Sequence, residues 1–221
     1  MQPPGRRRNT AGAVVPGTLE FKPFPSRFHC EFSIMPLSAS APRKLSHHRT
    51  IHCRGYERED GLWDIEGHLV DAKTFPVPFA HRNGMIQPGE PIHEMWVRFT
   101  IDLDFLIHDV EAVADSHPHR ACGEVPPRFK RLKGLTIGPG WKKKVGELLG
   151  GTQGCTHLVE LLGPLATTAY QTLYPFRKER DMAAGTYRPA VLDTCHALAS
   201  DGEAVRMLWP EHYTGRREKA G

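Results

Sequence analysis

The stretch GLWDIEGHLVDAK, residues 61–73, alternates between apolar and polar side chains. Successive residues of a β-strand point to opposite faces, so this alternation predicts a strand with one buried and one polar face. The apolar side carries Trp63, Ile65 and Leu69. The polar side carries Asp64, Glu66 and His68. The polar row is either a wet outer surface or the wall of a pocket suited to acid–base chemistry.

Three more strands are predicted around this one, which itself spans residues 62–72. Residues 49–60 form the strand before it, with Asp60-Gly61 as the signal for a hairpin. Residues 92–102 and 105–115 alternate in the same way. The proline-rich segment 74–91 between them is expected to be a loop or a ragged edge.

Helices are predicted after the strands. Short helices are expected within residues 116–132, 134–151 and 189–200. The clearest helix spans residues 155–174, where leucines recur at helical spacing and Gly163-Pro164 should introduce a kink. Strands first and helices afterwards indicate an α+β fold, with an antiparallel β-sheet of about four strands followed by helices packed on one face.

The chain of 221 residues is long enough for one sizeable domain with tails. Residues 1–45 are rich in Pro, Ser and Arg and are expected to be a disordered N-terminal extension. Residues 46–200 are expected to form a single α+β domain, and residues 201–221 a C-terminal tail. Five cysteines without regular spacing favour free thiols in a reducing cytoplasm.

The net charge of +4 is concentrated at the ends of the chain. Residues 1–34 carry +3 and residues 213–221 carry +2, which leaves −1 for everything between. A near-neutral body is not typical of a nucleic-acid-binding protein. The sequence contains no run of about 18 apolar residues, which is the length that would predict a membrane span. Neither nucleic acid nor a membrane is therefore an expected partner, and a homo-oligomer is a further option.

Two polar rows would meet if the strands 62–72 and 92–102 pair. Arg98 would then lie near Glu66. At a wet surface such a pair contributes under about 1 kcal/mol. A tryptophan among these charges suits the floor of a pocket better. We therefore take Glu66 and His68 as candidate catalytic residues. The candidate substrate-binding residues are Asp64, Trp96, Arg98, Tyr56 and His93.

A second candidate set lies in GGTQGCTHLVELL, residues 150–162. Cys155 would stand at a helix N-terminus, where the helix dipole favours a thiolate. His157 and Glu160 are three residues apart and share one face of that helix. We count these three residues as candidate catalytic groups, with metal binding and ordinary helix-start chemistry as the alternatives. Their spacing is not a standard zinc spacing, and no metal is expected.

Three motifs resemble a bacterial family of domains of unknown function, over roughly residues 35–200. They are GYEREDGLWDIEGHLVD (55–71), HEMWVRFTID (93–102) and GGTQGCTHLVELL (150–162). Members of the family occur in bacteria that degrade aromatic and lignin-derived compounds. The family is also similar to a lyase that releases formaldehyde from lignin-type dimers. Separately, the order of Cys122 and Cys155 resembles iron–sulfur scaffold proteins, although the third cysteine of that pattern is absent.

The resemblance implies an enzyme, namely a cofactor-independent lyase that acts on a phenolic, lignin-derived small molecule. Cleavage of the C–C bond would need a base to ionise the phenol, an acid for the leaving oxygen and a base for the primary alcohol. The substrate itself would accept the electrons, so no cofactor is expected. Two alternatives stay open. One is a metal- or thiolate-dependent hydrolase or carrier using Cys122, Cys155 and His157. The other is a non-catalytic small-molecule binding domain.

Overall fold

The computed structural model of the chain describes residues 37–79 and 84–215. The chain divides into two units, Met1–Arg43 and Lys44–Gly221. Residues 37–43, the described part of the first unit, contain no helix or strand. All described helices and strands belong to the second unit. Most of the predicted N-terminal extension, residues 1–45, lies outside the described residues.

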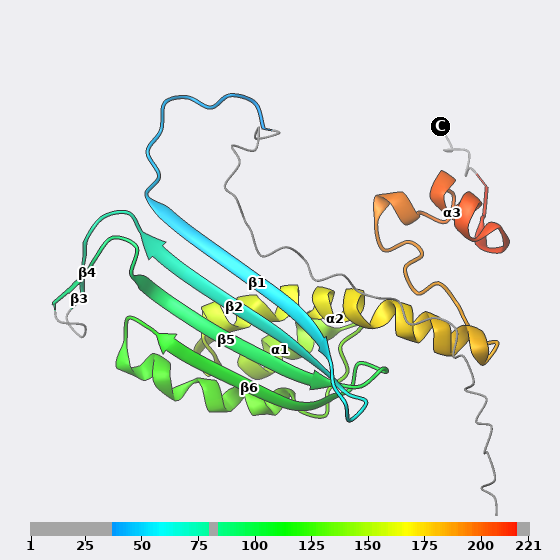
Figure 1. Cartoon of the computed structure of the whole chain (residues 1–221), viewed down its shortest axis with the longest axis horizontal. Coiled ribbons are helices and arrows are strands. Elements are labelled where there is room, and N and C mark those ends of the chain that lie inside the picture. The colour runs from blue at the N-terminus through cyan, green and yellow to red at the C-terminus, as the bar shows by residue number, and fades with distance from the viewer. Residues whose placement is uncertain (1–36, 80–83, 216–221) are drawn as a thin grey trace, which may run out of the picture. The chain divides into compact units, whose positions relative to one another are not determined.

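The second unit is built on a four-stranded antiparallel sheet in the order β1-β2-β5-β6 (Figure 1). The strands are β1 (His47–Glu57), β2 (Trp63–Lys73), β5 (Pro91–Ile101) and β6 (Ile107–Ser116). The predicted strands and their antiparallel arrangement are confirmed. The helices follow in the sequence, which confirms the α+β class.

The turn between β1 and β2 is the hairpin that Asp60-Gly61 predicts. The two strands pair along their whole length, from His47 opposite Lys73 to Glu57 opposite Trp63. Gly61 has a φ of 80°, a left-handed conformation that glycine adopts without steric cost. The backbone N–H of Arg58 donates to the carbonyl of Leu62 at 2.9 Å and closes the turn.

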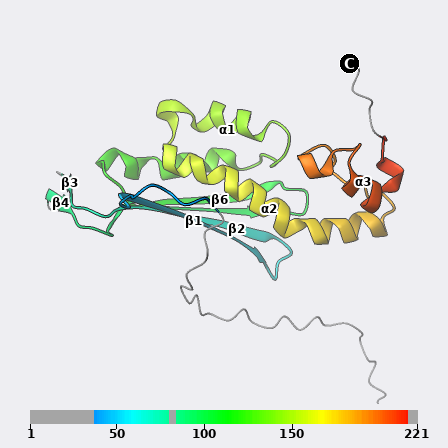
Figure 2. The ribbon, with the colours of Figure 1, turned by 90° about the horizontal axis from the view of Figure 1, so that it is seen from above.

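The alternation of β2 separates a buried face from an open one. Its residues alternate strictly between buried and partly exposed from Trp63 to Asp71. The buried face packs under helix α2 (Thr156–Ala183), which runs along one side of the sheet together with α1 (Trp141–Leu149) (Figure 2). The central core residues come from β2, β5 and α2, and include Ile65, Leu69, Met95, Phe99, Leu161 and Leu165.

Helix α2 lies close to the sheet because two strand positions facing it are glycines. A Cβ atom at Gly55 would lie 2.0 Å from Oγ1 of Thr172, and one at Gly67 would lie 3.2 Å from the side chain of Leu165. The helix is longer than the predicted 155–174 and continues through Pro164 and Pro175. Its buried leucine stripe outweighs the hydrogen bonds that the prolines remove.

Several elements differ from the prediction. The expected loop 74–91 contains a small hairpin of β3 (Val77–Phe79) and β4 (Gly84–Ile86). The segment 116–132 forms two 3₁₀ helices, η1 (Arg120–Glu124) and η2 (Pro126–Leu132). Prolines at the start of η2 remove backbone donors, which suits a short 3₁₀ turn. The helix expected within 134–151 is α1, followed by η3 (Gly151–Gln153).

The prediction of a helix over residues 189–200 is wrong. That segment consists mainly of turns and contains only the 3₁₀ turn η4 (His196–Leu198). A short helix, α3 (Glu203–Leu208), follows it within the predicted C-terminal tail, and η5 (Pro210–His212) comes next. Within residues 37–79 and 84–215, no helix combines the length and the apolar character needed to cross a membrane.

Candidate functional site

The polar row of β2 lies on the open face of the sheet, opposite α2. Glu66 stands directly across from Arg98 of β5, and their charged groups are 3.6 Å apart. Arg98 also forms an ion pair with Glu111 of β6. Asp64 accepts a hydrogen bond from Oγ1 of Thr100 at 2.7 Å. The predicted contact between the two polar rows is therefore present, as a cross-strand network on an open surface.

An aromatic stack interrupts this open face. The ring of His68 lies 3.5 Å from that of Trp96, with the planes 9° apart, and His68 contacts Glu94 through Nε2 at 3.0 Å. Trp96 is 38% exposed and borders two hollows of about 190 and about 40 Å³. Glu66 and Arg98 also line the larger hollow. Tyr56, opposite Asp64, is exposed nearby on β1.

The other candidate residues lie on the helix-covered face, so the sheet separates them from this row. His93 shares the parity of the buried residues of β5, and its ring stacks on that of His157 with centroids 3.6 Å apart. Cys155 and Glu160 flank His157 at the start of α2. The structure thus joins His93 to the helix-start set and leaves Glu66, His68, Asp64, Trp96 and Arg98 on the opposite face.

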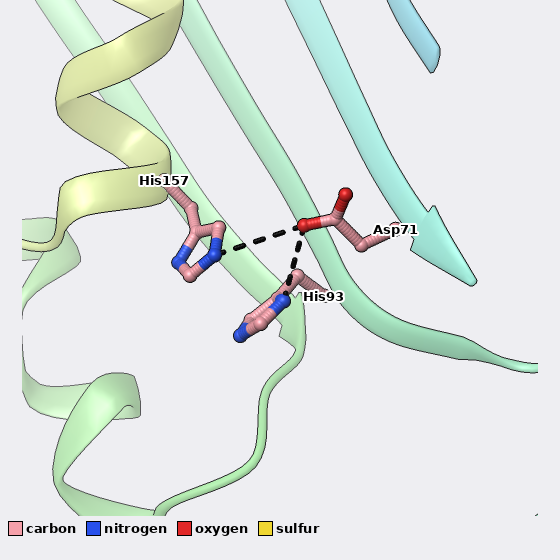
Figure 3. A group of neighbouring side chains, drawn as sticks. All are labelled: Asp71, His93 and His157. Atoms are coloured by element: carbon pink, nitrogen blue, oxygen red, sulfur yellow. Dashed lines mark hydrogen bonds and ion pairs between the residues drawn. The ribbon is translucent and has the colours of Figure 1, made fainter. Parts of the chain in front are cut away.

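Asp71 is the centre of the cluster on the covered face (Figure 3). It lies at the end of β2, directly opposite His93 of β5, and is only 2% exposed. Oδ2 of Asp71 is 3.2 Å from Nδ1 of His93 and 3.7 Å from Nε2 of His157. A register irregularity follows Asp71 in the β2–β5 pairing, a feature that is common beside functional sites.

The guanidinium group of Arg49 binds the carboxylate of Asp71. Arg49 of β1 donates from Nε and Nη2 to the two carboxylate oxygens, both at 2.7 Å. The same guanidinium pairs with Glu160 of α2. His47 adds a contact to Oδ1 of Asp71 at 3.1 Å. This two-point grip fixes the orientation of the carboxylate and directs Oδ2 toward the histidine pair.

Burial and charge act in opposite directions on these groups. Burial raises the pKa of Asp71, but the hydrogen bonds and charge of Arg49 outweigh it, and the net pKa is lowered. Burial, and after it the neighbouring His157, lower the pKa of His93 to about 4 against the opposing effect of Asp71. Burial also lowers the pKa of His157. The cluster at neutral pH is one carboxylate beside two neutral imidazoles.

The lowered pKa of His93 predicts that the protein loses stability in mild acid. Well above pH 6.5 the imidazole is neutral in both the folded and the unfolded chain. Between pH 6.5 and about 4 the unfolded chain takes up a proton that the folded chain does not, so the free energy of unfolding falls as the pH falls. Urea unfolding of the protein at pH 7 and pH 4.5, with a chelator present, should show this loss, and His93→Gln should reduce it. An equal loss in the variant would contradict the assignment.

Of the two cysteines that the sequence suggests for a site, Cys155 lies beside the Asp71 cluster and Cys122 lies outside it. Sγ of Cys155 is 4.0 Å from Nδ1 of His157, on the ring edge away from the Nε2 that faces Asp71. Cys122 lies in η1 and belongs to no group of three clustered ligand atoms among the described residues. The set Cys122, Cys155 and His157 is therefore not brought together as a metal site.

Asp71, Arg49 and His47 were not among the predicted site residues. One signal for Asp71 was present in the sequence, because it follows Trp63, Ile65 and Leu69 on the apolar side of β2. A carboxylate in a buried row needs a partner. Arg49 and His47 carried no comparable signal, since they depend on which strand pairs with β2.

The ligand atoms of Asp71, His93 and His157 all lie within 4.8 Å of one another. Two ligands bound about 2.1 Å from one metal ion lie roughly 3.0–3.4 Å apart at octahedral or tetrahedral angles. The 3.2 Å between Asp71 and His93 matches this spacing, and the 3.7 Å to His157 is slightly longer. At 3.7 Å the contact is too long for a hydrogen bond. The three ligand atoms are therefore close enough to share one metal ion, and binding it would require the stacked rings of His93 and His157 to move apart.

The fold and this cluster define an α+β protein with a two-histidine, one-carboxylate group between the sheet and the start of its longest helix. The chain belongs to the family described as "Protein of unknown function (DUF2889)", which matches residues 47–171, more than half of the chain. The match includes every residue of the Asp71 cluster. No curated protein matches the chain. No solved structure matches it either.

Proposed function

We propose that the chain is a metalloprotein that binds one divalent first-row transition metal ion through Asp71, His93 and His157. The observation that carries the proposal is the convergence of Nδ1 of His93 and Nε2 of His157 on a single oxygen of Asp71. Two imidazoles and one carboxylate suit zinc and iron. Three elements, β2, β5 and α2, supply one ligand each, which makes the site a product of the fold.

The surroundings support a metal site in two ways. Arg49 binds the carboxylate and orients it, as hydrogen-bonding partners of metal ligands do. A carboxylate oxygen has two lone pairs, so Oδ2 can accept from Arg49 and still bind a metal ion. Asp71 and Glu160 bring two negative charges against the one positive charge of Arg49. The cluster therefore has a net negative charge that a cation would offset.

Three protein ligands leave coordination positions open. Sites that bind a metal ion through three side chains are typical of catalysis, in which the ion polarises water or a substrate oxygen. Closed structural sites use four protein ligands instead. The proposed function is therefore that of an open, catalytic type of metal centre. This departs from the expectation that the chemistry needs no metal, and it replaces Cys122 and Cys155 by Asp71 and His93 in the metal-dependent alternative.

A metal titration with one matched variant tests the proposal. Metal-free protein titrated with Co²⁺ or Zn²⁺ should bind one ion per chain. His157→Ala should weaken the affinity by more than about 100-fold, since even the partners of metal ligands are worth 10- to 100-fold. His52→Ala removes a histidine from the open face of β1 and should leave the affinity unchanged. Equal affinities in the two variants would contradict the site.

A second candidate function is the formaldehyde-releasing lyase that the family resemblance implies, acting on a phenolic small molecule. The open hollow of about 190 Å³ beside Trp96 supports it, because it places an aromatic surface beside charged side chains that suit a polar aromatic molecule. Glu66 and Arg98 line this hollow, and His68 stacks on its tryptophan. The described cysteines are free thiols, which is consistent with the cytoplasmic location proposed for such an enzyme.

The lyase proposal predicts a specific kinetic result. With a phenolic dimer that carries a primary alcohol, Glu66→Gln should reduce formaldehyde release by about 100-fold or more while folding stays near normal. Glu59→Gln, in the exposed β1–β2 turn, is the matched control and should not change turnover. Release of formaldehyde at the wild-type rate by Glu66→Gln would mean that the open-face row is only a solvated surface.

A further inference from the structure

A separate cavity of about 840 Å³ lies between α1, the middle of α2 and the segment 190–194. It shares no residue with the Asp71 cluster or with the hollow beside Trp96. Its volume falls within the range of about 300–1,000 Å³ that is typical of small-molecule sites. Neither the metal site nor the proposed lyase chemistry uses it.

Aromatic side chains line this cavity, and contacts with neighbouring residues restrict their movement. Trp141 packs edge-on against Phe99, and its Nε1 donates to the carbonyl of Leu162 at 3.4 Å. The ring centroid of Phe105 lies 6.0 Å from that of Tyr170 and 4.7 Å from the guanidinium of Arg177. These contacts hold the rings in place before any ligand arrives.

The backbone at Phe105 is also unusual. Phe105 has a φ of 62°, which a bulky side chain rarely adopts. Two hydrogen bonds fix it there. Its N–H donates to the carbonyl of Asp102, and its own carbonyl accepts from the N–H of Ile137, both at 3.0 Å. The turn after β5 is thus held in a conformation that places an aromatic ring in the cavity wall.

The charged groups at the cavity are cationic. Lys142 and Lys143 line it, and none of its described lining residues is an aspartate or a glutamate. Lys143 lies 3.9 Å from Glu147. In the described part of the chain Lys142 has no ion-pair partner. An apolar cavity with an unpaired cation complements a molecule that has an apolar body and one negative end.

We propose that this cavity binds an apolar monocarboxylate, with its hydrophobic body against Phe105, Trp141 and Tyr170 and its carboxylate near Lys142. The aromatic surface gives apolar contact area. Lys142 makes the cavity favour an anionic ligand, because a cationic ligand of the same shape would meet two lysines and no carboxylate.

Calorimetric titration with decanoate tests the proposal on the full chain. Decanoate should bind one molecule per chain, and decyltrimethylammonium should bind at least about 10-fold more weakly. Ala166→Phe places a ring inside the cavity and should weaken decanoate binding by about 10-fold or more. Lys142→Gln should weaken it by about 3- to 5-fold, the scale of one exposed ion pair. Lys144→Gln, on the same helix but not lining the cavity, should bind like the wild type.

Three outcomes would overturn the proposal. They are the absence of decanoate binding up to its solubility limit, equal binding of the cation, and wild-type binding by Ala166→Phe that keeps the circular dichroism spectrum of the folded chain. If Ala166→Phe does not fold, the comparison of Lys142→Gln with Lys144→Gln decides, and equal affinities of these two variants reject the site.

Discussion

Asp71→Asn is expected to lower the affinity for a divalent transition metal ion by more than about 100-fold, an effect as large as that of His157→Ala. The substitution removes the one anionic ligand and the oxygen on which both histidines converge. It also leaves the guanidinium of Arg49 without the carboxylate that it grips at two points. Calorimetric titration of metal-free protein with Zn²⁺ measures the affinity.

The control is Asp115→Asn, which removes an equal charge from an exposed position of β6. It should bind metal like the wild type, because its carboxylate is not part of the cluster. Stability must be followed in parallel, since the partly buried guanidinium of Arg49 loses its carboxylate partner Asp71 and keeps only Glu160 among the described residues, a loss of about 1–3 kcal/mol. An affinity of Asp71→Asn within about threefold of the control would contradict the role of Asp71 as a ligand.

Phe99→Ala is expected to lower the free energy of unfolding by about 3–5 kcal/mol, the largest effect on stability. Phe99 is fully buried on the covered face of β5 and packs edge-on against Trp141 of α1. Its removal leaves a cavity between the sheet and the helices that the rigid sheet cannot close. Urea unfolding followed by circular dichroism measures the change.

Tyr56→Ala is the matched aromatic control on the open face. Tyr56 is 43% exposed, so its loss should cost under about 1 kcal/mol. Similar losses in the two variants would mean that the sheet is not covered on one face only, and the division between an open row and a covered cluster would fail with it.

The fold could be predicted because its signals are local. Alternation over residues 61–73 determined which side of β2 is buried, and the leucine stripe identified the helix that covers it. The β3–β4 hairpin was missed because Pro76 and Pro78 obscure a strand only three residues long. The last helix was misplaced because residues 189–200 contain the apolar residues of a helix but form turns, with Asp193 at a left-handed φ of 58°.

The covered cluster could be predicted only in part, because its members meet through the fold. His157 and Glu160 were visible as neighbours on one helix face. Their contact with His93, Asp71 and Arg49 depends on the register of three strands and on where α2 begins over the sheet. No spacing of residues in the sequence indicates that these side chains come together. The open-face pair of Glu66 and Arg98 was predictable because it needs only the pairing of two neighbouring strands.

X-ray absorption at the zinc edge, on protein loaded with one equivalent of Zn²⁺, tests the metal centre most directly. The account predicts two imidazole nitrogens at about 2.0–2.1 Å and carboxylate oxygen at about 2.0–2.2 Å, without a sulfur neighbour at about 2.3 Å. The imidazole signal should fall by half in His93→Ala. A spectrum with no imidazole signal, or one that His93→Ala leaves unchanged, would contradict the assignment of Asp71, His93 and His157 as the metal site.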